Sequence, residues 1–114
     1  MEGFEQLLAY RRAAAFADEL RGEAIAWPSF DLWTVGVQLV RAADSVGANI
    51  AEAYGRRTDA DRRRFLFIAR GSTCELEHWM LRASARGLGV PSNAMSRARE
   101  NGRLLNGLAK SWSP

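Results

Sequence analysis

The chain has 114 residues, of which 47% are hydrophobic and 25% charged, and it contains 16 basic and 13 acidic residues. These are globular proportions, and they exclude collagen-like, mucin-like and intrinsically disordered chains. The length favours one domain, residues 1–114, that can bury a core without disulfides or metals.

Helical periodicity marks the first half of the chain, where apolar residues recur at spacings of three and four. The first predicted helix covers residues 4–21, and Gly22 follows it as a plausible stop. The second covers residues 30–54, with Ser29 as its cap. Gly47 lies inside the second helix, where a glycine indicates a kink or a close contact with another helix.

The second half of the chain contains two further predicted helices. The third covers residues 59–86, with Thr58 as its N-cap and Asp61 as a weak capping-box partner. The fourth covers residues 93–111, with Ser92 as a candidate cap. Strict two-residue alternation is absent, so no strand is expected. Four helices joined by short links predict an all-α fold, an up-and-down four-helix bundle.

The aromatic content exceeds the needs of a slim bundle, since the sequence holds four Trp and five Phe. Trp33, Phe67 and either Trp79 or Met80 are the candidates for a subunit interface. Each of them alone could equally well pack in the core. Together they favour a homo-oligomer, because a large apolar surface is rarely left open in a soluble monomer.

Residues suited to catalysis are few. His78 is the only histidine, and a lone histidine on a helix lies more often at a surface or interface than in an active site. Glu75 and His78 match the Glu-x-x-His spacing of di-iron bundles, but this motif occurs once, and only a symmetric oligomer would multiply it. Cys74 lies beside an apolar seam, as a packing residue would. We therefore expect no enzymatic activity, no metal and no cofactor.

Charge is distributed unevenly along the chain. Residues 1–55 carry four Arg and eight acidic residues, whereas residues 55–64 carry five Arg and two Asp. After position 96, four basic residues face one Glu. Such concentrated segments attract an anion more strongly than the net charge of +3 suggests. A solvated charged surface without a partner is the alternative, and charge alone supports the two interpretations about equally.

The segment 55–64 begins the third predicted helix, where the helix dipole and an excess of Arg favour a phosphate. Asp59 lies four residues before Arg63, and Asp61 three residues before Arg64, so local ion pairs are expected. Arg56 and Arg57, which precede both aspartates, have no such acid nearby.

The residues expected to contact phosphates form two groups. The first, in the basic segment, is Arg56, Arg57, Arg63 and Arg64. The second, in the fourth predicted helix, is Arg97, Arg99, Arg103 and Lys110. No base-reading motif is recognisable, so contacts to the nucleic-acid backbone with little sequence preference are expected.

A polar stripe also occupies one face of the second predicted helix, where Asn49, Glu52 and Arg56 follow at spacings of three and four. Ser72 and Glu75 of the third helix could form hydrogen bonds with this stripe. We favour a structural network of Asn49, Glu52, Ser72 and Glu75 that joins the two helices. A binding site is the alternative.

Three segments carry a resemblance to a known family, namely residues 49–56 (NIAEAYGR), 64–72 (RFLFIARGS) and 75–77 (ELE). They resemble the four-helix-bundle proteins that are encoded in intervening sequences of bacterial 23S rRNA genes. The resemblance implies an up-and-down bundle that assembles as a homopentameric ring. It also implies kinship with the accessory variability determinant of diversity-generating retroelements, a basic pentameric bundle that binds nucleic acid and a reverse transcriptase.

Two positions depart from the family pattern. The family usually has proline where this chain has Gly47, and glycine where it has Ala53. The first change could preserve a kink flexibly, and the second needs slightly more space at a close helix contact. The departures concern local geometry rather than the fold.

The start of the chain lacks the basic-then-apolar plan of a secretion signal, and no apolar run approaches the roughly 20 residues that span a bilayer. We therefore expect a cytoplasmic protein that is not membrane-bound. The leading hypothesis is a non-enzymatic, oligomeric bundle that binds RNA or DNA through its basic patches. The alternative is a protein-interaction adaptor that docks a partner such as a reverse transcriptase.

Overall fold

The computed structural model describes residues 3–112, so the first two and last two residues of the predicted domain lie outside the described range. Over this range the chain forms helices and turns and no strand, which confirms the all-α prediction. Its elements are η1 (Phe4–Gln6), α1 (Leu8–Ala24), α2 (Ser29–Asp31), η2 (Leu32–Gly36), α3 (Val37–Gly55), α4 (Asp59–Ala85) and α5 (Ala94–Ser111).

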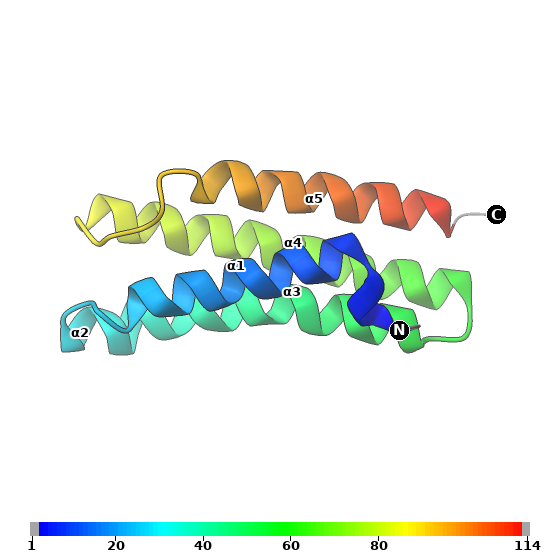
Figure 1. Cartoon of the computed structure of the whole chain (residues 1–114), viewed down its shortest axis with the longest axis horizontal. Coiled ribbons are helices and arrows are strands. Elements are labelled where there is room, and N and C mark those ends of the chain that lie inside the picture. Colours follow the sequence, from blue (N-terminus) through cyan, green and yellow to red (C-terminus); the bar gives the residue numbers. More distant parts are fainter. Residues whose placement is uncertain (1–2, 113–114) are drawn as a thin grey trace.

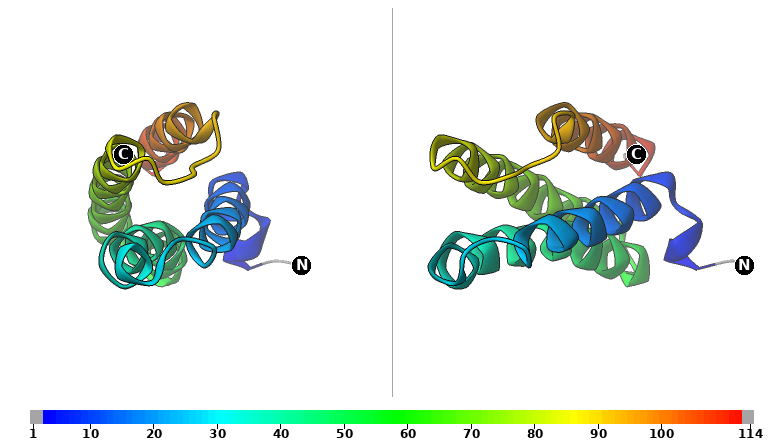
Figure 2. Two further views of the ribbon diagram at one scale, coloured as in Figure 1. Left: turned by 90° about the vertical axis from the view of Figure 1, so that its left-hand side faces the viewer. Right: turned by 60° about the vertical axis from the view of Figure 1, so that its left-hand side comes forward.

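The four long helices run alternately up and down in a rod of 47 × 24 × 20 Å (Figure 1). Helix α1 packs on α3, α3 on α4 and α4 on α5, whereas α1 and α5 contact each other much less. Viewed along the rod, the helices therefore form an arc with α1 and α5 at its two ends (Figure 2). None of the described helices is both long enough and apolar enough to span a bilayer.

The start of the second helix and the end of the first differ from the prediction. Gly22 does not stop α1, which continues to Ala24 because this exposed glycine is still compatible with a helix. The chain leaves the helix only before Pro28, which disfavours helical backbone at the residue that precedes it. Pro28 also occupies the N-cap position of α2, so Ser29 is not a cap but the first helical residue.

The boundaries of α4 follow standard capping chemistry. The Thr58 hydroxyl accepts a hydrogen bond from the Asp61 N–H at 3.1 Å, which confirms the predicted N-cap. At the other end Gly87 has φ of +73°, and the Leu88 N–H bonds the Ala83 carbonyl at 3.0 Å. This is a Schellman motif, and the left-handed backbone at its centre favours glycine.

The predicted cap of the last helix is wrong. Asn93, not Ser92, precedes α5, and it forms no side-chain capping bond. The Ser96 hydroxyl instead donates to the Asn93 carbonyl at 2.9 Å.

The second predicted helix is one continuous helical stretch, but its beginning is wound as a π-helix over Leu32–Gly36. In a π-helix each backbone hydrogen bond joins residues five apart, whereas in an α-helix it joins residues four apart. Beside this segment Phe30 and Trp33 are 79% and 71% exposed. Farther along, α3 passes Gly47 without interruption, and an added Cβ would meet the Tyr10 ring at 3.6 Å. Gly47 therefore marks a close contact between helices rather than a kink.

The core is divided into two apolar clusters along the rod. The first surrounds Phe16, Leu20, Leu39, Leu76 and Met80, near the α1–α2 link. The second, toward the α3–α4 turn, is centred on Val46, Ile50, Ala53, Leu66 and Leu105. Met80 is 2% exposed, so its assignment to a subunit interface is wrong. Ala53 is fully buried, and its methyl group is accommodated in the second cluster.

Thr73 in α4 and Asn101 in α5 are buried polar residues. In each helix the residue lies between the positions that belong to the first cluster and those that belong to the second. The Thr73 hydroxyl donates to the Ala69 carbonyl at 3.1 Å, within its own helix. We call these two residues the polar layer, which separates the two apolar clusters along α4 and α5.

Candidate nucleic-acid interface

The α3–α4 turn and the last turn of α5 meet at one end of the rod (Figure 1). Six basic side chains belong to these segments, together with three acidic ones, Glu52, Asp59 and Asp61, which leaves a net charge of +3. We call this region the basic end, and its basic residues are Arg56, Arg57, Arg62, Arg63, Arg64 and Lys110.

Arg56 is held by acids on both sides of the turn. Its guanidinium is 2.6 Å from a Glu52 oxygen and 3.6 Å from an Asp61 oxygen, and it lies 4.3 Å above the Phe65 ring centre. The expectation that Arg56 has no nearby acid is therefore wrong. Glu52 precedes it by one helical turn, and the first turn of α4 brings Asp61 back toward it.

Arg62 and Arg63 fasten the turn to α5. Arg62 pairs with Asp59 at 3.5 Å, donates to the Arg56 carbonyl at 2.8 Å and lies over the Trp112 ring. Arg63 donates to the Trp112 carbonyl. Asp59 therefore pairs at a spacing of three, with Arg62, and the predicted pair with Arg63 is not formed.

The remaining basic residues of this end differ in whether another residue pairs with them. Arg64 pairs with Asp61 at 2.9 Å, as predicted. Arg57 and Lys110 are exposed, and within residues 3–112 neither side chain has an ion pair or hydrogen bond. Together with Arg63, which bonds only a backbone carbonyl, they are the basic side chains of this end that no acid of residues 3–112 pairs with.

The second predicted group does not form a single patch with the first. Arg97 pairs with Glu19 of α1, and Arg99 pairs with Glu77 of α4 at 3.2 Å, so they lie on different sides of α5. Arg103 borders an apolar groove of about 380 Å³ between α1 and α5, together with Leu8. Of the second group, Lys110 alone lies in the turn of α5 that reaches the basic end.

The predicted polar network is formed in part. Asn49 donates to the Ser45 carbonyl at 2.9 Å and to its hydroxyl at 3.1 Å, and the Ser45 and Ser72 hydroxyls are 2.8 Å apart. Asn49 and Ser72 are thus linked through Ser45, which joins α3 to α4. Glu52 belongs to the ion pair with Arg56, and Glu75 accepts a hydrogen bond from Trp79 at 3.3 Å. These two glutamates therefore have other partners.

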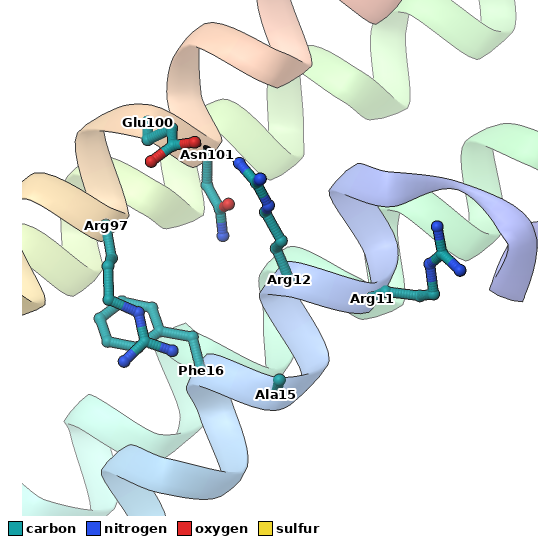
Figure 3. A pocket seen from close by; sticks show the side chains of 7 residues that line it. All are labelled: Arg11, Arg12, Ala15, Phe16, Arg97, Glu100 and Asn101. Atoms are coloured by element: carbon teal, nitrogen blue, oxygen red, sulfur yellow. Dashed lines mark hydrogen bonds and ion pairs between the residues drawn. The ribbon is translucent and has the colours of Figure 1, made fainter.

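A pocket of about 350 Å³ with both charged and apolar lining residues lies between α1 and α5 (Figure 3). Its lining consists of Arg11, Arg12, Ala15, Phe16, Arg97, Glu100 and Asn101. Sequence reasoning missed this site because the acidic first half of the chain hides Arg11 and Arg12 in its average charge. Asn101 offered a signal, since it follows Ala98 by three residues and precedes Leu105 by four, and so takes an apolar position of the seam.

Within residues 3–112, no group of three or more His, Cys, Asp and Glu side chains could hold a metal ion. His78 is exposed and lies edge-on to Trp79, with ring centres 4.8 Å apart. Cys74 is exposed as well, which contradicts its assignment as a packed residue, and it accepts a hydrogen bond from Arg70 at 3.3 Å.

Comparison with known proteins gives one family. No curated protein matches the chain. The sequence profile of the family described as 23S rRNA-intervening sequence protein matches residues 5–107, which include all four long helices almost to the end of α5. The chain therefore belongs to the 23S rRNA-intervening sequence protein family.

Proposed function

We propose that this protein is a non-enzymatic, oligomeric helical bundle that binds RNA or DNA through phosphate contacts at its basic end. The observation that carries the proposal is the net charge of +3 at that end, with Arg57 and Lys110 exposed and without an acidic partner in the described chain. Unpaired cations release counterions from a nucleic acid when they bind its phosphates, and this release drives salt-dependent association.

The other arginines of the basic end support the same reading in a different way. Arg56, Arg62 and Arg64 are fixed by acids, so they contribute a positive surface of defined shape rather than free charges. Contacts of this kind position a protein on the phosphate backbone and carry no sequence information. We therefore expect similar affinity for strands of unrelated sequence.

We further propose that the chain assembles into a ring, as the homopentamer of the resemblance would. Exposed Phe30, Trp33 and Phe67 supply apolar surface for such an interface. A ring repeats the basic end once per subunit, and several weak sites that act together bind far more tightly than one. Multi-angle light scattering tests the assembly, and a monomer mass at micromolar concentration would contradict it.

Fluorescence anisotropy with a labelled single-stranded RNA and a DNA duplex, at several salt concentrations, tests the binding. We expect association at low salt and a steep fall in the logarithm of affinity with the logarithm of salt. The double variant R57A/K110A should bind more weakly and with a shallower salt slope. Absence of binding at low salt, or binding that does not depend on salt, would reject the proposal.

A second candidate function is that of an adaptor for a protein partner such as a reverse transcriptase. The specific observation in its favour is the exposed pair Phe30 and Trp33, which lies at the end of the rod opposite the basic end (Figure 1). Co-purification with a reverse transcriptase that survives nuclease treatment and is lost in W33S would support this function. Loss of the partner on nuclease treatment would instead attribute the association to nucleic acid.

A further inference from the structure

The pocket between α1 and α5 contains a buried amide without a partner. Asn101 is 7% exposed, and its side chain makes no hydrogen bond within the described part of the chain. No polar side-chain atom there is both sealed from solvent and unpaired, so the amide faces the open space of the pocket. Figure 3 shows it directed from α5 into the gap, between Arg12 and Arg97.

Burying an amide without a hydrogen bond is unfavourable, and proteins rarely retain one. Thr73 provides the comparison within this molecule, because it lies in the same polar layer and donates to a backbone carbonyl at 3.1 Å. Asn101 has no such partner in its own helix. Its amide atoms are therefore left to solvent, or to a ligand that displaces that solvent from the pocket.

The walls of the pocket restrict what that group can be. The Arg97 guanidinium lies 4.4 Å above the centre of the Phe16 ring and also pairs with Glu19, so it is held over an aromatic side chain by two contacts. On the other side of Asn101, Arg12 pairs with Glu100 across the gap between the helices. A planar ligand can stack on a guanidinium held in this way.

The lining carries one arginine that no acid of residues 3–112 pairs with. Arg12 pairs with Glu100 and Arg97 with Glu19, which leaves Arg11. Arg11 is exposed, and Figure 3 shows its side chain directed away from Asn101 along α1. An anionic group attached to a planar ligand would pair with Arg11 once this exposed side chain turns toward the pocket, while the planar part occupies the pocket.

We propose that the α1–α5 pocket binds an unpaired adenine base of a nucleic-acid strand. An Asn amide offers a donor and an acceptor side by side, and these match N7 and the N6 amino group of adenine. The base stacks on the Arg97 guanidinium, and its 5′-phosphate lies near Arg11. A volume of about 350 Å³ falls in the range of small-ligand sites, about 300–1,000 Å³. The claim that the base belongs to a nucleic-acid strand rests on the proposed function, whereas the base site itself does not.

Equilibrium dialysis of the full chain against AMP, dAMP and ribose 5-phosphate at low salt tests the site. We expect AMP and dAMP to bind better than ribose 5-phosphate, because only they carry the base. Asn101→Leu should weaken AMP binding by about tenfold or more, which is the range for one bidentate base contact. Asn106→Leu is the matched control, since Asn106 is exposed on the same helix and lies outside the lining.

Folding of the variant is checked by its melting temperature. Asn101→Leu should melt at or above the temperature of the unaltered protein, because it replaces an unpaired buried amide with an apolar group. A second variant, Ala15→Trp, blocks the mouth from an exposed position of α1 and should also abolish AMP binding. Ala85→Trp, exposed at the end of α4, is its control. Equal binding of AMP and ribose 5-phosphate, or AMP binding that both pocket variants retain, would overturn the site.

The source of the base is tested with two single strands of equal length, an oligoadenylate and its abasic counterpart. We expect the protein to prefer the oligoadenylate, and Asn101→Leu to bind both strands equally while keeping the salt-dependent part of its affinity. R57A/K110A should show the opposite pattern, with weaker binding of both strands and an unchanged AMP affinity. If AMP binds but the strands bind equally, the ligand is a free nucleotide and the strand assignment is wrong.

Discussion

At the residue scale, the basic side chains differ in how many acceptors already hold them. Arg62 has an acidic partner, a backbone carbonyl and an aromatic ring, whereas the exposed Arg57 has none of these within residues 3–112. Arg62 therefore stabilises the α3–α4 turn, and Arg57 remains available to a ligand. The two arginines lie in the same charged segment and look equivalent in the sequence, but their contacts differ.

The first prediction concerns Arg57→Ala. We expect it to lower affinity for any nucleic acid and to reduce the salt slope by about one for each subunit engaged, because one phosphate contact is lost. Anisotropy titrations at four salt concentrations measure both quantities. Arg21→Ala is the control, since Arg21 is equally exposed but lies near the opposite end of the rod. Equal effects of the two substitutions would mean that only total charge matters.

The second prediction concerns Gly71, which lies in the middle of α4. It is exposed, and an added Cβ would meet no atom within 4 Å. Gly71→Ala should therefore raise the free energy of unfolding by about 1 kcal/mol, the difference in helix propensity between the two residues. Urea denaturation measures the change. Gly36→Ala should raise the free energy of unfolding by less, because the added Cβ would approach a Leu32 methyl group at 3.2 Å.

Individual side-chain partners were only partly predictable from the sequence. Helical spacing correctly paired Asp61 with Arg64, but it paired Asp59 with Arg63, whereas the structure pairs Asp59 with Arg62. Both spacings bring side chains together on a helix. The choice depends on Trp112, whose carbonyl takes Arg63, and that contact joins segments 49 residues apart.

At the scale of single elements, capping determines where the longest helix begins. The third prediction is that Thr58→Ala destabilises the protein by about 1 kcal/mol, because the Asp61 N–H loses its acceptor. Thr58→Ser should restore most of this loss, since serine also supplies a hydroxyl. Thermal unfolding followed by circular dichroism measures both variants. A loss of similar size in the serine variant would show that the hydroxyl is not what stabilises the helix start.

The apolar spacing predicted the four long helices well, and it failed at details that the spacing does not encode. Leu32, Val35 and Leu39 follow one another at spacings of three and four residues, which fit an α-helix. The π-helical winding over Leu32–Gly36 was therefore not predicted. In α4 the adjacent Phe65 and Leu66 are both apolar, but Leu66 is 1% exposed, whereas Phe65 is only partly buried against the second cluster. A face only one residue away has nearly the same periodicity, and tertiary packing selects between them.

At the scale of the whole molecule, the polar layer separates the core into two apolar clusters. The fourth prediction is that damage to one cluster loosens the nearer half of the rod more than the other. Leu20→Ala, in the first cluster, should cost about 2–5 kcal/mol and should reduce amide-exchange protection around Leu39 more than around Ile50.

Leu105→Ala in the second cluster should produce the reverse pattern, so each variant is the control for the other. Native-state hydrogen exchange followed residue by residue gives the measurement. A uniform loss of protection along all four helices would mean that the rod unfolds as one unit, and that the polar layer does not divide it.

The sparse contact between α1 and α5 has a consequence for how the chain is made. Each long helix packs chiefly on the one synthesised just before it, α3 on α1, α4 on α3 and α5 on α4. During translation, α3, α4 and α5 each leave the ribosome after the helix on which they chiefly pack, and contacts between neighbours in sequence form quickly. The seam between the first and the last helix closes only after α5 has docked, so the pocket that contains Asn101 is the last part of the structure to be completed.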